Sequence, residues 1–344
     1  MRPCSARCAP APASGAAAMR RQTRELAGRL FDAEPEQVIF TMNATHGLNI
    51  ALRSLVRPGG RVVLSGMEHN AVTRPLAALG AQIETADAPP FAPERLLEGF
   101  ARALQQGADA AVCTHVSNVY GNVLPVSAVA ALCRERGVPL VIDASQSAGT
   151  LPVRLHGTGA AFIAMPGHKG LYGPQGTGLL LCGAAGEPLL QGGTGSNSLD
   201  QSMPDFLPDR HEAGTHNVCG IGGLLAGLRF VREQRPEELL AVERALTALA
   251  ARGLRQLPGV EVFTGPGQSG VLSFRCRDLD CEEAAARLAE AGIAVRAGLH
   301  CAPMAHRSGG TLETGTVRVS FSAFNTSAEV RQFLQVCRTA FLPG

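Results

Sequence analysis

The chain has almost no lysine: 30 of its 31 basic residues are arginine, and Lys169 is the single exception. It also lacks an excess of either charge, because 31 basic side chains face 29 acidic ones, for a formal net charge of +2. This balance argues against nucleic acid or an anionic membrane as the main partner. An apolar fraction of 45% over 344 residues supports a large core, which excludes intrinsic disorder and suggests about two domains.

Long apolar runs and a dense cysteine framework are absent as well. No run approaches the roughly 18 residues that a membrane-spanning helix needs. The ten cysteines are spread thinly from Cys4 to Cys337, which favours a reducing, cytoplasmic setting over a disulfide-stabilised secreted domain. Pro10 and Pro12 interrupt the alanine-rich start, so we expect residues 1–18 to form a disordered tail rather than an export signal.

From about residue 20, short β-like runs alternate with helical segments. The candidate strands are 37–41, 61–65, 110–115, 139–143, 160–165 and 178–182. Helices are expected at 45–56 and at 127–136, the second with Ser127 as its N-cap. Alternating β and α units with nearly continuous apolar strands predict an α/β fold with a mostly parallel central sheet covered by helices. Ligands of such sheets bind beyond the carboxyl ends of the strands.

The pattern changes near residue 220, where a long helix begins, followed by mixed helix and strand segments. We therefore expect residues 19–225 to form a large α/β domain. Residues 226–344 are expected to form a smaller α+β domain.

Lys169 lies in AAFIAMPGHKGLYGPQGTG, directly after an apolar run and among glycines that let the backbone approach a ligand closely. Only a primary amine that can lose its proton attacks a carbonyl carbon to form an imine, so arginine cannot replace lysine in that chemistry. An ordinary surface lysine is the alternative interpretation of this residue alone.

Asp143 ends an apolar run in PLVIDASQSAG, and Gln146 follows three positions later. A carboxylate at the carboxyl edge of the sheet can hold a heterocyclic nitrogen protonated, which pyridoxal phosphate needs in order to act as an electron sink. An aspartate that caps a turn fits the same segment. It is the combination with Lys169 that favours the cofactor.

Three further segments offer polar groups after predicted strands. Asn43, Ala44 and Thr45 precede an amphipathic helix, where free backbone N–H groups and a hydroxyl suit an anion, although simple N-capping fits equally well. His69 follows the next strand and could lie against a flat ring or move protons, or be a structural histidine. Asn118 occupies the equivalent place in HVSNVYGN, where an ordinary turn is the alternative.

The segments NATHGLN, MEHNAVTRPL, HVSNVYGN, VIDASQSAG and GHKGLYGPQGTG occur in this order along the chain. Their spacing resembles the class V aminotransferase group of pyridoxal-phosphate enzymes, specifically the cysteine desulfurases and their selenocysteine-lyase relatives. The resemblance runs from about residue 19 to the C-terminus. It implies a fold-type I transferase architecture and pyridoxal 5'-phosphate as the cofactor.

Position by position, the resemblance implies that Lys169 binds the cofactor covalently and that Asp143 pairs with its pyridine nitrogen. His69 would stack on the ring. Gln146 would donate to the phenolic oxygen, and Asn118 would lie beside it.

The resemblance also implies a phosphate site. Ala44, Thr45 and His168 would contribute from one chain, and Thr215 in EAGTHN would reach in from a partner subunit. The protein would then be a homodimer with shared active sites. Many relatives have a phosphate-binding Ser or Thr at the position of Pro166.

Cys301 lies in VRAGLHCAPMAHRSGG, which resembles the desulfurase loop that carries the nucleophilic thiol. Arg296 and His300 precede it, and cationic neighbours lower a thiol pKa from about 8.5. Flanking glycines predict a mobile loop. An inert cysteine is the alternative, and a metal site with His300, Cys301 and His306 lacks a second ligand pair at zinc-like spacing, so no metal is expected. Arg318 resembles the family arginine that binds the substrate carboxylate, and Asn118 would assist there.

The function implied is conversion of L-cysteine to L-alanine with a persulfide on Cys301, and a protein sulfur acceptor is a candidate partner. Selenocysteine lyase and class V aminotransferase activity remain alternatives on the same scaffold. A truncated or vestigial protein that binds cofactor without turnover is the alternative of another class. Its basis is that nothing in residues 1–18 resembles the Asp-Asn-Ala-Ala-like segment near the start of relatives.

Overall fold

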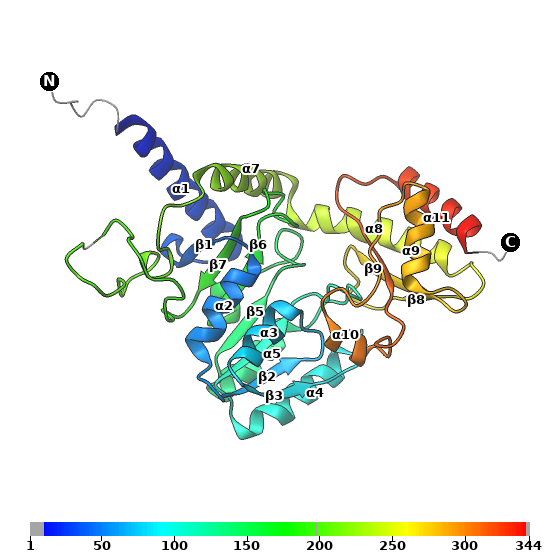
Figure 1. Ribbon diagram of the computed structural model, residues 1–344, viewed down its shortest axis with the longest axis horizontal. Coiled ribbons are helices and arrows are strands. Elements are labelled where there is room, and N and C mark those ends of the chain that lie inside the picture. Colours follow the sequence, from blue (N-terminus) through cyan, green and yellow to red (C-terminus); the bar gives the residue numbers. More distant parts are fainter. Residues whose placement is uncertain (1–9, 197, 342–344) are drawn as a thin grey trace.

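The computed structural model describes residues 10–196 and 198–341 (Figure 1). Its centre is a seven-stranded sheet with the order β1-β7-β6-β5-β4-β2-β3. The strands are β1 Val38–Thr41, β2 Arg61–Ser65, β3 Gln82–Ala86, β4 Ala110–Thr114, β5 Leu140–Asp143, β6 Phe162–Pro166 and β7 Gly178–Cys182. Strand β7 runs antiparallel to both neighbours, whereas β3, β2, β4, β5 and β6 pair in parallel. The predicted mostly parallel sheet is confirmed.

Helices cover both faces of this sheet. They are α1 Pro10–Phe31, α2 Ala44–Leu55, α3 Asn70–Ala78, α4 Pro93–Ala103, α5 Val126–Glu135, α6 Leu155–Thr158 and α7 Val218–Gln234. Neighbouring strand residues enter different cores: Val63 packs with α1, α4, α5 and α7, while Val62 and Leu64 pack with α2 and α3. Burial on both faces explains why the strands are continuous apolar runs in the sequence.

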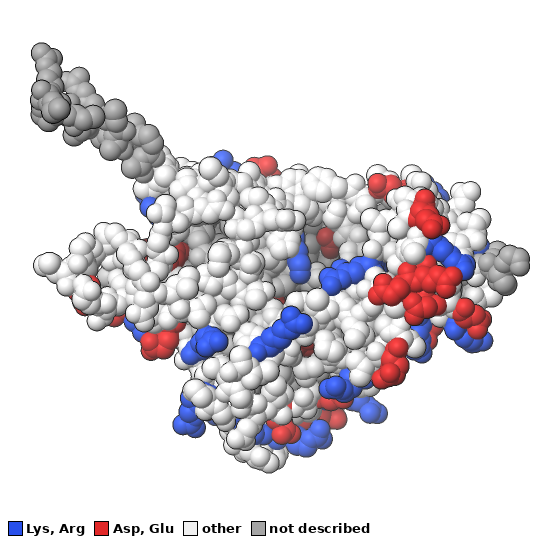
Figure 2. Space-filling view, in the orientation of Figure 1, with Lys and Arg blue, Asp and Glu red and all other residues white. Residues whose placement is uncertain are grey.

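A smaller domain follows, built on a three-stranded antiparallel sheet with the order β10-β9-β8. Its elements are α8 Pro236–Leu254, β8 Val260–Phe263, β9 Val271–Cys276, α9 Cys281–Glu290, β10 Val317–Ser320 and α11 Ser327–Ala340. The short helix α10 Pro303–Ser308 lies between α9 and β10 in the sequence but packs against the large domain, whose core includes Ala305. Leu246, Phe274, Leu288 and Phe333 belong to the separate core of the small domain. On the face that Figure 2 shows, acidic and basic side chains lie close together over this domain.

Two expected boundaries differ from the structure. Residues 10–18 belong to α1, so the expected disordered tail is wrong for them, and residues 1–9 lie outside the described residues. Alanine favours helix, and proline is tolerated in a first turn, whose N–H groups need no helical partner. The expected domain boundary after residue 225 falls inside α7, where Leu225 and Leu228 enter the large-domain core. The chain leaves that domain near Arg235, whose φ is +64°.

Two local expectations also need correction. Helix α5 begins at Val126 with Pro125 as its N-cap, so Ser127 is not the cap. The Pro125 carbonyl already accepts from Ala128 and Val129, which starts the helix two residues earlier. Edge strand β3 was not expected, because Gln82 and Glu84 are exposed there and its sequence is not an apolar run.

The described residues also bear on the chain's setting. Their eight cysteines are free thiols. Within residues 10–196 and 198–341, no helix combines the length and the apolar character that crossing a bilayer requires.

Candidate active site

Four predicted site residues follow the carboxyl ends of neighbouring strands. Asp143 ends β5, Asn118 follows β4, His69 follows β2, and Lys169 lies in the loop between β6 and β7. Because β6, β5, β4 and β2 are adjacent and parallel, these residues meet at one edge of the sheet. The sheet topology alone brings together segments that are far apart in the chain.

The charges at this edge act on one another. Desolvation by the cavity walls lowers the pKa of Lys169, Asp143 opposes this shift, and Arg318 and Arg296 add to it. The pKa of His69 is also lowered by burial, raised by Asp143 and lowered by Lys169, Arg296 and Arg318. A lowered lysine pKa increases the fraction of neutral amine, which is the form that attacks a carbonyl.

Asp143 and His69 each accept one hydrogen bond from a backbone N–H two residues further along the chain. Asp143 is 3% exposed, and its Oδ1 accepts from Ser145 N at 2.9 Å. His69 Nδ1 accepts from Ala71 N at 3.0 Å and caps α3, which leaves the proton on Nε2. Asp143 therefore caps a turn and His69 has a structural role, as the alternative interpretations of these two residues expect. These roles leave Asp143 Oδ2 and His69 Nε2 without a hydrogen bond to any described residue, and so available to a ligand.

Lys169 lines a cavity of about 450 Å³ between the two domains. Gln146 and His168 line it from the large domain, and Arg318 lines it from β10 of the small domain. Glu243 of α8 faces the same cavity, and burial raises its pKa to about 7. The structure thus brings the predicted amine and the predicted carboxylate-binding arginine to one space.

The guanidinium of Arg318 is held by one hydrogen bond, and its other N–H groups make none to the described residues. Its Nη1 donates to the Asn118 carbonyl at 2.9 Å, while its Nε is buried without a hydrogen-bond partner among the described residues. Burial and the nearby charge of Arg296 lower the pKa of Arg318, whereas Cys301 raises it. Two crowded guanidiniums and an unpaired buried donor form a site that suits a carboxylate.

The loop carrying Cys301 is tied to the large domain. The Cys301 carbonyl accepts from Asn70 N at 2.7 Å, and the His300 carbonyl accepts from Asn118 Nδ2 at 2.9 Å. His300 and Cys301 both adopt left-handed backbone angles, with φ of +51° and +58°. The glycines around this loop predict mobility, but these bonds anchor the exposed thiol at the edge of the site.

The two predicted cationic neighbours of the thiol differ. Arg296 Nη2 donates to Cys301 Sγ at 3.3 Å. His300 is 2% exposed, and burial together with Arg318 lowers its pKa to about 3, so it is neutral. The expectation that His300 contributes positive charge is wrong, because its ring is turned into the core, where Nε2 pairs with Thr316 Oγ1 at 3.0 Å. In the described part of the chain, no three metal-ligating side chains come together to hold an ion.

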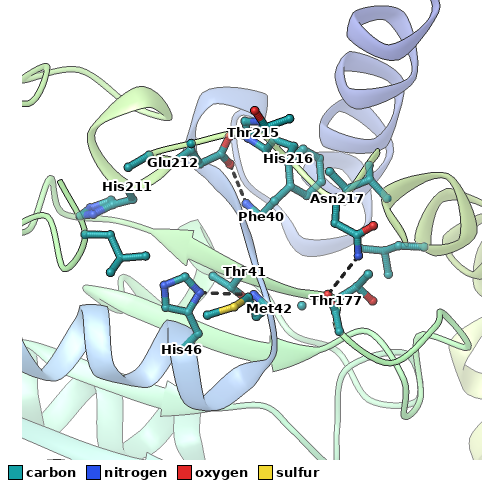
Figure 3. Close-up of a pocket in the computed structure, with 17 residues that line it drawn as sticks. Phe40, Thr41, Met42, His46, Thr177, His211, Glu212, Thr215, His216 and Asn217 are labelled. Carbon is teal, nitrogen blue, oxygen red and sulfur yellow. Dashed lines mark hydrogen bonds and ion pairs between the residues drawn. The ribbon is translucent and has the colours of Figure 1, made fainter. Parts of the chain in front are cut away.

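The predicted phosphate-binding residues are only partly brought to this cavity. Ala44 and Thr45 begin α2, whose N-cap Asn43 accepts from His46 N at 2.9 Å, so the first N–H groups remain available. Thr215 is exposed and lines a different cavity of about 200 Å³, which His46 lines from the opposite side (Figure 3). Within one chain, Thr215 and Lys169 therefore face separate spaces.

Comparison with known proteins identifies the family. The sequence model described as aminotransferase class-V matches residues 7–333. The chain belongs to this family. It is 32% identical over 329 residues to a probable cysteine desulfurase of Methanothermobacter thermautotrophicus, covering 90% of this chain and 81% of that protein. It is 30% identical to a cysteine desulfurase of Synechococcus elongatus, covering 93% of this chain and 53% of that protein.

Solved structures of this family have the same fold. An apo cysteine desulfurase from Thermococcus onnurineus NA1 superposes with a TM-score of 0.87 at 30% identity, covering 95% of this chain and 85% of that one. The cysteine desulfurase CsdA of Escherichia coli gives a TM-score of 0.86 at 26% identity, covering 98% and 87%. The expected fold-type I architecture is confirmed.

The sequence did not point to Glu68, the neighbour of His69 in this class-V fold. Glu68 is fully buried, and its Oε1 accepts from Thr114 N at 2.7 Å and from the Ser65 hydroxyl. Burial raises its pKa to about 8, the two hydrogen bonds lower it, and Asp143 raises it further. The carboxyl therefore joins the ends of β2 and β4 behind the site. An isolated glutamate in the sequence does not reveal such burial.

Proposed function

We propose that the protein is a pyridoxal-phosphate-dependent cysteine desulfurase that converts L-cysteine to L-alanine and holds the sulfur as a persulfide on Cys301. The observation that carries this proposal is the meeting of Lys169, Asp143, Arg318 and an anchored, exposed Cys301 at one sheet edge. The class-V family and the cysteine desulfurases among its similar proteins support it.

The residues present fit pyridoxal 5'-phosphate. Lys169 is the one side-chain primary amine in the sequence, and Asp143 offers a buried carboxylate oxygen that no described residue uses. His69 would contact the ring, Gln146 its phenolic oxygen, and His168 the phosphate. When bound, the cofactor supplies an electron sink for the charge that develops at the substrate Cα.

Substrate binding, proton transfer and attack on sulfur are each assigned to different residues of the chain. Arg318 binds the substrate carboxylate through its unpaired donors, next to Asn118. Lys169 takes the Cα proton and later returns it, for which its lowered pKa is suited. The Cys301 thiolate, stabilised by Arg296, attacks the substrate sulfur: an S–S bond forms and the Cβ–S bond breaks. The carbon keeps that electron pair and is protonated, so one cysteine and one thiol give one alanine and one persulfide.

The assembly belongs to the same proposal. Thr215 faces a cavity away from Lys169 of its own chain. This supports a homodimer in which Thr215 would bind the phosphate of the cofactor held by the partner subunit. Ala44 and Thr45 would hold that phosphate from the chain that supplies Lys169. The free thiols support a reducing cytoplasm as the setting, and a protein would accept the sulfur.

The test is purification with pyridoxal phosphate, followed by an absorbance scan and an assay for alanine and sulfide from L-cysteine. We expect a cofactor band and equal amounts of the two products in the presence of a reducing thiol. Cys301→Ala should abolish both products and keep the band, whereas Cys219→Ala, which removes another exposed thiol, should change neither.

Other outcomes separate the alternatives. Transamination that survives Cys301→Ala would indicate an aminotransferase. Turnover of selenocysteine alone would indicate a lyase specific for selenium. A band without any product would indicate the vestigial protein, and the absence of a band would refute the proposal.

A further inference from the structure

A buried chain of hydrogen bonds links helix α1 to the segment that contains Thr215. Figure 3 shows the bond of this chain that joins Glu212 to Phe40. Glu212 is 8% exposed; its Oε1 accepts from Phe40 N at 2.7 Å, and its Oε2 accepts from Arg24 Nη2 at 2.5 Å and from His216 Nε2. Arg20 Nη1 lies 2.8 Å from His216 Nδ1. One arrangement of protons satisfies all four contacts: Arg20 donates to His216, and His216 and Arg24 donate to Glu212.

The electrostatics are those of an ionised carboxylate. Burial raises the pKa of Glu212, but the hydrogen bond from His216, the charge and bond of Arg24 and the bond from Phe40 N outweigh it, so the net shift is downward. The side chains of Arg24 and Glu212 are only 12% and 4% exposed. A buried ion pair often contributes little net stability, because desolvation offsets the attraction, but it fixes the geometry of the segments that it joins.

These hydrogen bonds hold a short segment, and its anchoring residues lie on both sides of Thr215. Glu212 and His216 hold it to α1 and β1, and Asn217 accepts from Gly220 N at 3.0 Å as the N-cap of α7. Between these anchors, Thr215 is exposed toward the cavity that His46 lines, and its hydroxyl makes no hydrogen bond to any described residue. The anchors therefore surround a hydroxyl with a free donor.

We propose that Arg20, Arg24, Glu212 and His216 are positioning residues that hold the Thr215 hydroxyl for the cofactor phosphate of the partner subunit. The inference rests on the proposed function, in which Thr215 acts across the homodimer. Two arginines of α1 thereby control cofactor retention in the other subunit, although neither touches a cofactor.

Mixed dimers of two differently tagged, co-expressed chains test this directly. One chain carries Lys169→Ala and the other Glu212→Gln. The only working site takes Lys169 from the Glu212→Gln chain and Thr215 from the Lys169→Ala chain, whose Glu212 is intact. The readout is the pyridoxal-phosphate concentration that gives half-maximal activity, because only this site contributes turnover.

We expect the Glu212→Gln homodimer to need roughly tenfold more cofactor, the loss typical of one charge-assisted hydrogen bond. The mixed dimer should return to the wild-type concentration with half of the wild-type activity per dimer. If the mixed dimer needs as much cofactor as the Glu212→Gln homodimer, Glu212 acts on the site of its own chain and the inference is overturned.

A Lys169→Ala/Thr215→Ala mixed dimer separates this inference from the proposed function. If the cofactor requirement returns to the wild-type value in this mixed dimer but not in the Lys169→Ala/Glu212→Gln mixed dimer, the positioning role of Glu212 is overturned, while the shared site is supported. Failure of both refutes the shared site as well.

A milder variant covers the case that Glu212→Gln does not fold. Arg20→Met breaks only the outermost contact and should show the same recovery in mixed dimers, with an unchanged unfolding midpoint of the apo protein. Arg21→Met is the matched control, because its side chain is 76% exposed on the same helix. A loss of cofactor affinity in Arg21→Met equal to that in Arg20→Met would overturn the inference.

Discussion

Arg296 Nη2 lies 3.3 Å from Cys301 Sγ and donates a hydrogen bond to it. Backbone bonds fix Arg296: its N donates to the Arg318 carbonyl at 3.1 Å, and its carbonyl accepts from Arg318 N at 2.7 Å. His300, the immediate neighbour of Cys301, is neutral because burial and Arg318 lower its pKa to about 3. The positive charge that can stabilise a thiolate at this position therefore comes from Arg296 rather than from the imidazole.

Arg296→Met should make Cys301 less reactive at neutral pH. Methionine removes the cation and the hydrogen-bond donor that lie against Cys301 Sγ and favour the thiolate, so alkylation at neutral pH should slow by up to about tenfold. The measurement is the pH dependence of Cys301 alkylation by iodoacetamide, in a Cys219→Ser background. Arg307→Met, which removes an exposed arginine on α10, should leave the profile unchanged. Identical profiles for Arg296→Met and the parent protein would contradict the prediction.

Much of the fold follows from local sequence patterns. Strands β2 and β7 begin and end as predicted, because each is a run of apolar residues bounded by small or polar ones. Asp143 and Lys169 could be placed at the sheet edge because each directly follows such a run, and parallel strands end at the same edge.

What the sequence could not predict depends on distant segments. The neutrality of His300 follows from its burial near Arg318 and Thr316, and the raised pKa of Glu68 from burial near Thr114 and Asp143. The extent of α7 depends in the same way on its packing against α1. In each case the local pattern is compatible with several environments, and only tertiary contacts select one.

Lys169→Arg should keep the charge at the sheet edge and lose the chemistry. Arginine cannot supply a neutral primary amine, so covalent cofactor attachment disappears and activity falls by about 100-fold or more, the range of general acid–base catalysis. Borohydride reduction of the wild-type holoenzyme should label one peptide, which contains Lys169, and should label none in the variant. Labelling of the wild-type protein at the N-terminal amine alone would contradict this assignment.

Arg318→Lys should weaken substrate binding without loss of cofactor. Lysine cannot reproduce the two-pronged contact with a carboxylate, so kcat/KM should fall by roughly 10- to 100-fold, mainly through KM. The cofactor absorbance of the variant should match that of the wild-type protein. Arg277→Lys, a change at an exposed position in the loop after β9, is the control and should keep wild-type kinetics. A fall in kcat with unchanged KM would indicate that Arg318 acts on the chemical step instead.

Glu68→Gln should change how stability depends on pH. Burial raises the pKa of Glu68 to about 8 from an ordinary 4.5, so the folded protein holds a proton that the unfolded chain releases between these values. Stability from this group is therefore present at low pH and is lost as pH rises from about 4.5 to 8. Glutamine keeps the acceptor for Thr114 N and Ser65 but does not titrate, so the variant should gain roughly 3 to 4 kcal/mol relative to wild type between pH 5 and pH 9. Urea unfolding of the apo proteins at both pH values measures this, with Glu84→Gln, whose side chain is 50% exposed on β3, as the control. A stability difference that is the same at both pH values would mean that Glu68 is ionised in the folded protein, in which case its charge would act on Asp143 directly.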